Sequence, residues 1–196
     1  IRENQAESNG HRWGKQIFFM GIAILGIGLF WMQKDHYKAY QQWNKAQMFY
    51  NNKAYEAALE VYEPLYPLLK HKPEFLFEAA QSLSKTGQYE KANEYLERAV
   101  LLSSDPMLYY VMAKNEQCLG EYRQAEKHLL HAIDILPERI YPYYLLMNLY
   151  TEPSYFQPAK LKMAIDSVLT KKPKVESSAI KEMKEKARSM LNNTSI

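Results

Sequence analysis

Two patterns of apolar residues divide the chain. The first is an uninterrupted run from Ile17 to Met32 that contains only Ile, Phe, Met, Gly, Ala, Leu and Trp. The second lies further along, where alanines and larger apolar residues return at helical spacing between short polar turns. The run predicts a helix that is apolar on all sides, and the recurring pattern predicts amphipathic helices.

The apolar run predicts a transmembrane helix over residues 16–33. Trp13 and Trp31 lie near its ends, where indole rings favour the membrane interface, and Lys15 and Lys34 flank it. With its flanking turns, the segment approaches the roughly 20 residues that a spanning helix needs. A buried core helix and a signal peptide are the alternatives, although no small-residue cleavage site follows the run.

A spanning helix predicts a single-pass location in a bacterial inner membrane. Basic residues are equally frequent close to both ends of the run, so the positive-inside rule does not fix the orientation. We favour the periplasmic side for the rest of the chain. The first residue is Ile1 and not Met, which indicates a processed product or a fragment of a longer protein.

A pattern of about 34 residues recurs three times after the apolar run. Its members are a tyrosine, an alanine three residues later, a second apolar position and an upstream alanine: Tyr55, Tyr89 and Tyr122; Ala58, Ala92 and Ala125; Leu65, Ala99 and Ala132; Ala46, Ala80 and Ala113. A helix pair cannot bury its apolar face alone, so this repetition predicts stacked helix pairs that share one core.

Turn residues mark the ends of the predicted helices. Gly87 and Gly120 suit a left-handed backbone in the turn before the tyrosine, whereas the first unit has Lys53 at this position. Pro106 and Pro137 predict the end of the second helix of a pair, because proline cannot continue a helix.

The last part of the chain is less regular. Phe156 and Ala159 keep the spacing of a fourth unit, but Pro153 and Pro158 interrupt its loop. Residues 177–191 predict an amphipathic helix that caps the stack, with four apolar residues on one face: Ile180, Met183, Ala187 and Leu191. The predicted fold is all-α, with one transmembrane helix followed by a solenoid of three to four helix pairs and a capping helix.

The predicted organisation has four parts, namely a juxtamembrane segment (1–15), the transmembrane helix (16–33), the solenoid (34–191) and a short tail (192–196). The motif Gly-x-Tyr-x-x-Ala at Gly87 and at Gly120 resembles the tetratricopeptide repeat (TPR) family, and the resemblance covers roughly residues 38–191. It implies that the first helices of successive pairs line a concave groove. The residues expected in that groove are Tyr40, Trp43, Gln47, Tyr50, Phe77, Gln81, Lys85, Tyr110, Lys114, Gln117, Tyr144 and Asn148.

A second resemblance lies near the end of the chain. The run LPERIYPYYLLMNLY, then a helix, then KKPKVESSAIKEMKEKARSML, is similar to the C-terminal region of bacterial O-antigen ligase family membrane proteins. This resemblance implies a part in ligating or polymerising surface polysaccharide. It carries over no catalytic residue, because the catalytic parts of that family lie in a membrane domain and a large loop that this chain does not contain.

Composition and candidate chemistry point away from catalysis and nucleic acid. The formal charge is +3, with 25 basic and 22 acidic residues, which gives no reason to expect nucleic acid. Cys118 is the one cysteine, so no intrachain disulfide can form. His128 and His131 could share a metal, but no third ligand has suitable spacing. We therefore predict no catalytic residue, metal or cofactor, and whether the chain takes part in an enzyme stays open.

These patterns predict a non-catalytic, membrane-anchored TPR interaction domain that belongs to a protein of surface polysaccharide ligation or polymerisation. The alternative is a single-pass scaffold that assembles envelope protein complexes. The expected partners are a protein or a glycan in the groove, and the membrane through residues 16–33. A chaperone adaptor that binds a peptide C-terminus is disfavoured, since Lys85 and Lys114 alone do not form a carboxylate clamp.

Overall fold

The fold is an array of antiparallel helices. The computed structural model describes the backbone of residues 3–173 and 175–193, and the side chains of residues 18–26, 28, 34–173 and 175–192. Over these residues the chain forms nine α-helices, one short 3₁₀-helix and no strand. The elements are α1 (Glu3–Asn51), α2 (Tyr55–Leu69), α3 (Pro73–Lys85), α4 (Tyr89–Val100), α5 (Pro106–Cys118), α6 (Tyr122–Ile135), α7 (Tyr141–Leu149), η1 (Pro153–Tyr155), α8 (Pro158–Thr170) and α9 (Ser178–Asn193).

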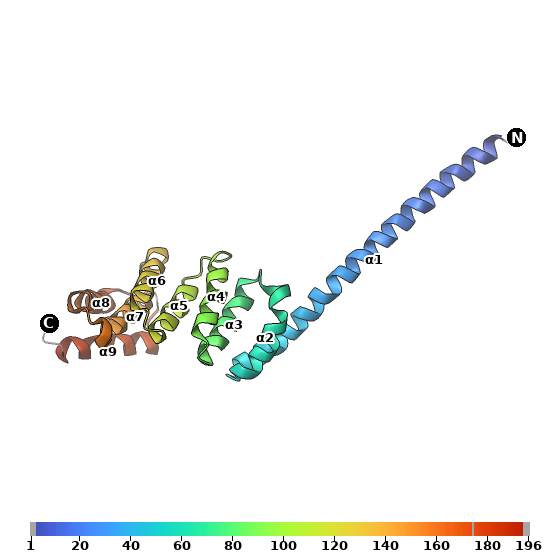
Figure 1. The fold of residues 1–196 in the computed structure, drawn as a ribbon. Coiled ribbons are helices and arrows are strands. Elements are labelled where there is room, and N and C mark those ends of the chain that lie inside the picture. The colour runs from blue at the N-terminus through green and yellow to red at the C-terminus, as the bar shows by residue number, and fades with distance from the viewer. Residues whose placement is uncertain (1–2, 174, 194–196) are drawn as a thin grey trace.

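The helices stack in chain order into a solenoid (Figure 1). Each helix from α1 to α9 contacts the next, and the pairs are α1 with α2, α3 with α4, α5 with α6, and α7 with α8. The last turns of α1 pack on α2, whereas its N-terminal part extends away from the stack. The predicted all-α repeat fold is therefore confirmed over the part of the chain that forms these pairs.

Small residues stand where the helices cross. Ala46, Ala80 and Ala113 on the first helices are fully buried, and so are the alanines that recur on the second helices, Ala58, Ala92, Ala99, Ala125 and Ala132. An alanine lets two helix backbones approach closely without leaving a void. Larger apolar side chains such as Tyr62, Phe75 and Leu129 fill the space between the crossings. The pattern in the sequence therefore corresponds directly to the core.

The turns within the first three pairs share one backbone conformation. Gly87 and Gly120 have φ angles of +81° and +77°, and Lys53 takes a φ of +60° at the same position of the first unit. At the turns between pairs, Pro106 occupies the first position of α5, and the carboxylate of Asp105 accepts a hydrogen bond from the N–H of Met107 at 2.9 Å. This proline thus starts a helix as well as following one.

The predicted capping helix is present as α9. It packs on α8 and α7, with Ala187 fully buried and Ile180 and Met183 half-buried against the last core cluster. Leu191 was expected on the same face, but its side chain is exposed. The predicted tail begins inside this helix, since α9 continues to Asn193, and residues 194–196 lie outside the described residues.

The predicted inner-membrane location is wrong. Among the residues that the structure describes, no helix is both long enough and apolar enough to cross a membrane. The apolar run has 16 residues against the roughly 20 that a span needs, and α1 continues from it without a break into Gln33, Lys34 and Asp35. The side chains of Trp13 and Trp31, expected at the interface, lie outside the described residues.

Candidate functional site

The predicted groove residues lie on helices that neighbour one another. α1 contacts α3, α3 contacts α5, and α5 contacts α7, so the first helices of successive pairs lie side by side. We call the side of the solenoid that these four helices form the first-helix surface. Gln47, Gln81, Lys114 and Asn148 occupy equivalent positions on it, at steps of 34, 33 and 34 residues.

Two of the predicted residues in the first unit donate hydrogen bonds to a glutamate of the second unit. The indole N–H of Trp43 donates to Oε2 of Glu78 at 2.7 Å, and the amide of Gln47 donates to Oε1 at 2.8 Å. The hydroxyl of Tyr62 on α2 also donates to Oε2, at 3.0 Å. Burial and the adjacent carboxylate raise the pKa of Tyr62. Trp43 and Gln47 therefore hold α1 on α3.

The other aromatic residues of the first two units also contact the protein itself. The centroid of the Tyr40 ring lies 5.9 Å from that of Trp43, and the Tyr40 side chain is exposed. The hydroxyl of Tyr50 donates a hydrogen bond to Oε1 of Gln81. Phe77 is half-buried against the core cluster. These rings thus combine packing between helices with partial exposure.

In the third unit the predicted residues separate into a buried one and exposed ones. Tyr110 is only 4% exposed, and its ring meets that of Tyr141 edge to face at 5.2 Å, so it belongs to the core. Lys114 is exposed, with its ammonium 5.9 Å from the centroid of the Tyr141 ring. Gln117 is half-buried, and Lys85 at the end of α3 is exposed.

In the fourth unit, Tyr144 and Asn148 are half-buried on α7. The ammonium of Lys186 on α9 lies 5.4 Å from the centroid of the Tyr144 ring. The side-chain oxygen of Asn148 is buried and has no hydrogen-bond partner among the described residues. An unsatisfied buried acceptor costs on the order of 1–3 kcal/mol, so this oxygen lowers the stability of the fourth unit.

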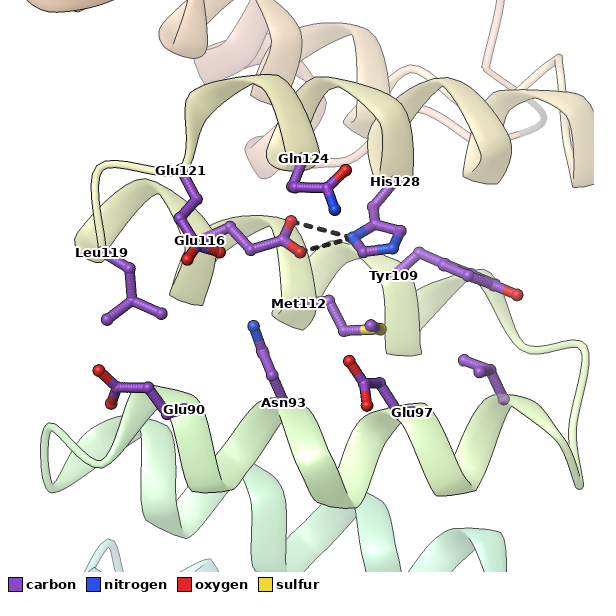
Figure 2. A pocket seen from close by; sticks show the side chains of 11 residues that line it. Glu90, Asn93, Glu97, Tyr109, Met112, Glu116, Leu119, Glu121, Gln124 and His128 are labelled. Atoms are coloured by element: carbon purple, nitrogen blue, oxygen red, sulfur yellow. Dashed lines mark hydrogen bonds and ion pairs between the residues drawn. The ribbon is translucent and has the colours of Figure 1, made fainter.

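A pocket of about 390 Å³ opens between α4, α5 and α6 (Figure 2). Its polar lining comes from all three helices and their turns: Glu90, Asn93, Glu97, Glu116, Glu121, Gln124 and His128. Tyr109 and Met112 supply an apolar part of the wall. Glu90 and Glu97 point from α4 toward the pocket in Figure 2. The pocket is acidic and lies off the first-helix surface, because second helices form two of its sides.

A contact between a histidine and a buried glutamate fixes the wall of this pocket. Glu116 is 4% exposed, and Nδ1 of His128 lies 2.9 Å from each of its carboxylate oxygens. The carboxylate accepts the hydrogen bond, so Nδ1 carries the proton. The other predicted histidine, His131, packs edge to face on Tyr109 at 4.6 Å. Both histidine rings therefore contact Tyr109, since the ring of His128 lies 5.9 Å from it, but His128 also contacts Glu116.

A third glutamate outside the predicted set joins the third and fourth units. Glu126 on α6 accepts hydrogen bonds from the hydroxyls of Tyr150 (2.6 Å) and Tyr155 (2.7 Å) and from the ammonium of Lys160 (2.7 Å). Burial alone would raise the pKa of Glu126, but the three hydrogen bonds outweigh it and hold that pKa below its ordinary value. Burial, together with the hydrogen bond to this carboxylate, raises the pKa of Tyr150.

The repeat alignment contains a signal for some of these missed glutamates. Glu116 stands four residues before Gly120, where the second unit has Leu83 and the first has Phe49. A charged residue at a position that is apolar in the other units indicates a buried interaction. At the position of Glu126 the first unit has Leu59 but the second has Asn93, so the alignment singles out Glu116 and not Glu126. Their partners could not be deduced this way, since they come from other helices.

The comparisons with known proteins agree on the fold. A family model described as anaphase-promoting complex, cyclosome, subunit 3, matches residues 51–132, which is less than half of the chain. None of the curated proteins compared with the chain matches it.

Solved structures extend the likeness over most of the chain. A crystal structure of MamA protein has a TM-score of 0.62 at 17% identity and covers 79% of this chain and 88% of its own. MamA from Desulfovibrio magneticus RS-1 has a TM-score of 0.59 at 17% identity, and the match covers 76% of each chain. The TPR-like repeats of a kinesin light chain from Podosopora anserina have a TM-score of 0.58 at 17% sequence identity. This match covers 79% of this chain and 87% of the kinesin light chain structure.

At these identities the likeness shows the fold alone. The stacked pairs, the buried alanines and the left-handed turn before each tyrosine define a TPR-like α-solenoid. The fold of the chain is therefore TPR-like. The comparisons do not support the resemblance to O-antigen ligases.

Proposed function

We propose that this chain is a non-catalytic TPR-type scaffold that binds an extended segment of a partner protein on the first-helix surface. The observation that carries the proposal is the row of Gln47, Gln81, Lys114 and Asn148 at equivalent positions of four adjacent first helices. Such side chains can donate to or accept from the backbone of an extended peptide. Half-exposed Phe77 and Tyr144 beside them supply apolar contact.

The spacing of the row suits an extended peptide. Packed helices lie about 9 Å apart, and an extended chain rises about 3.3 Å per residue, so one helix step corresponds to about three residues. Gln47 and Gln81 already have partners in the protein, whereas Lys114 is exposed. Lys114 of the third unit is therefore the most available hydrogen-bonding group of the row.

A matched pair of charge reversals tests this site. Peptides that bind the full chain would first be selected from a library of random short peptides. Lys114→Glu on α5 should weaken their binding about tenfold, because it reverses a charge within the row. Lys127→Glu makes the same charge reversal at an exposed position of α6. This position lies outside the first-helix surface, so the variant should leave binding unchanged. Equal effects of the two variants would refute the proposed surface.

Two more specific expectations remain predictions. A glycan could use the same aromatic and amide side chains, and calorimetry with a surface oligosaccharide in place of the peptide would test this. A part in O-antigen-type ligation or polymerisation, or in assembling envelope complexes, would require partners that no comparison identifies. The proposal of a protein-binding scaffold depends on neither of these two expectations.

A further inference from the structure

A second concave site lies at the C-terminal end of the solenoid. It is a cleft of about 620 Å³ between the α6–α7 loop, the start of α7, the α8–α9 loop and the first turns of α9, and we call it the α7–α9 cleft. This volume falls in the range of about 300–1,000 Å³ that is usual for ligand sites. The cleft shares no lining residue with the predicted row on the first-helix surface.

The walls of the α7–α9 cleft are mainly apolar. Its larger apolar side chains are Leu136, Ile140, Tyr141, Val175, Ile180 and Met183. Val175 is 74% exposed and Leu136 is 39% exposed, although both face a concave site. Covering such side chains releases about 25 cal/mol for each Å² removed from water. An apolar side chain that enters the cleft therefore gains burial that the protein itself leaves unused.

Positive charge lines the same cleft. Arg139 and Lys172 are exposed and come from the two different loops, and neither forms an ion pair with an acidic side chain of the described residues. Lys171 differs, since its ammonium lies 3.8 Å from Glu138 and 4.9 Å from the Tyr143 ring. Glu138 is the acidic residue of the lining, and it has this lysine as its partner.

The charge of the surrounding chain has the same sign. Lys and Arg outnumber Asp and Glu over residues 137–196, whereas acidic residues dominate over residues 51–136. The N-terminal ends of α7 and α9 also border the cleft, and helix N-termini carry partial positive charge. A ligand that suits the α7–α9 cleft is therefore apolar and negatively charged.

We propose that the α7–α9 cleft docks a short protein segment in which large apolar side chains stand between acidic residues. The apolar side chains would occupy the wall that Val175 and Met183 form, and the two carboxylates would pair with Arg139 and Lys172. Two cations on separate loops suit a peptide with two acidic positions better than a ligand with a single carboxylate. The cleft is a different site from the row on the first-helix surface, although Tyr141 of α7 borders both, and it goes beyond the proposed function.

The test measures fluorescence anisotropy of a labelled Asp-Leu-Phe-Glu peptide with the full chain. Two further peptides serve as comparisons, Lys-Leu-Phe-Lys for charge and Asp-Ala-Ala-Glu for the apolar anchor. Saturable binding of the first peptide, with each comparison peptide about tenfold weaker or worse, is the expected result. Absence of saturable binding, or equal binding of the lysine peptide, would overturn the proposal.

Variants then locate the binding. Arg139→Glu reverses an exposed charge and Ala179→Trp fills the cleft from an exposed wall position, so each should weaken binding about tenfold. Lys162→Glu at an exposed position of α8 and Lys127→Glu at an exposed position of α6 lie outside the cleft and should not change it. Thermal unfolding by circular dichroism checks that each variant is folded. Binding that is lost in Lys114→Glu but retained in Arg139→Glu would overturn the cleft site without affecting the proposed function.

Discussion

The indole N–H of Trp43 on α1 donates a 2.7 Å hydrogen bond to the carboxylate of Glu78 on α3. The two residues are 35 positions apart and belong to different repeat units. Gln47 and Tyr62 donate to the same carboxylate, so Glu78 joins α1, α2 and α3 through neutral donors. The first unit is thus held to the second by polar contacts as well as by its apolar core.

Removing this acceptor should destabilise the N-terminal end of the solenoid. Glu78→Ala leaves three donors unpaired, and we expect the free energy of unfolding to fall by about 2 kcal/mol. Urea denaturation followed by circular dichroism measures the change. Glu74→Ala on the same helix is the control, because Glu74 is exposed and should cost no more than about 0.5 kcal/mol. Equal costs for the two variants would show that the network contributes nothing.

The same network changes the expectation for Trp43. A tryptophan that only lined an open groove could be replaced by alanine without loss of stability. Here its ring is half-buried, lies 5.7 Å from the ring of Phe75 and packs against the core cluster. We therefore expect Trp43→Ala to lower the unfolding free energy by about 3 kcal/mol in urea denaturation. A cost below about 0.5 kcal/mol would instead place Trp43 outside the cooperative unit.

Glu126 should make stability depend on acid pH. Its folded-state pKa lies below the ordinary value of 4.5, so its stabilisation is complete above the unfolded-state pKa and is lost as pH falls through the folded-state pKa. Glu126→Gln should flatten the fall in unfolding free energy that occurs as the pH drops below about 4.5. Urea midpoints at several pH values measure the pH dependence of stability. Glu60→Gln, at an exposed position of α2, is the control. Parallel pH profiles for wild type and Glu126→Gln would contradict it.

The helix crossings should tolerate no larger side chain. Ala92 is fully buried on α4, and Ala92→Leu should cost on the order of 1–3 kcal/mol through overpacking. Ala159→Leu on α8 is the matched control, because Ala159 is exposed and should change stability by no more than about 0.5 kcal/mol. Melting temperatures and urea midpoints for both variants decide whether the buried alanines set the helix spacing.

Much of the fold could be predicted because its signals are local and repeated. Ala80 and Ala113 mark helix crossings, and Gly87 and Gly120 mark left-handed turns, whatever the rest of the chain does. The apolar run was harder to interpret, since its composition resembles that of a membrane helix. No described helix is long and apolar enough to be one.

The candidate site could be predicted only in part, because its partners come from distant positions. Spacing placed Gln81 and Lys114 on neighbouring helices, but it could not show that Tyr50 binds Gln81 or that Tyr110 turns into the core. The α7–α9 cleft forms where two loops meet, and no periodic pattern links Leu136 to Val175. Tertiary placement, rather than local sequence, decides these features.

The turn at Lys53 offers a site where stability can be gained. Lys53 has a φ of +60°, a conformation that costs an L-residue roughly 1–2 kcal/mol, whereas the equivalent Gly87 and Gly120 adopt it freely. Glycine loses more freedom on folding, which offsets part of the gain, so Lys53→Gly should stabilise the protein by about 0.5–1 kcal/mol. Urea denaturation measures the gain, and a loss of stability would show that the lysine side chain makes a compensating contact.

The reverse substitution at Gly120 separates backbone strain from packing. A Cβ added at Gly120 would have no neighbouring atom within 4 Å, so no steric clash accompanies Gly120→Ala. Its cost should come from the φ of +77° alone and amount to about 1 kcal/mol. In urea denaturation, Gly120→Ala should lower the free energy of unfolding and Lys53→Gly should raise it. The double variant should show the sum of the two changes, because the two turns lie in different units. If Gly120→Ala were neutral, the left-handed turn would not be the reason for glycine at this position.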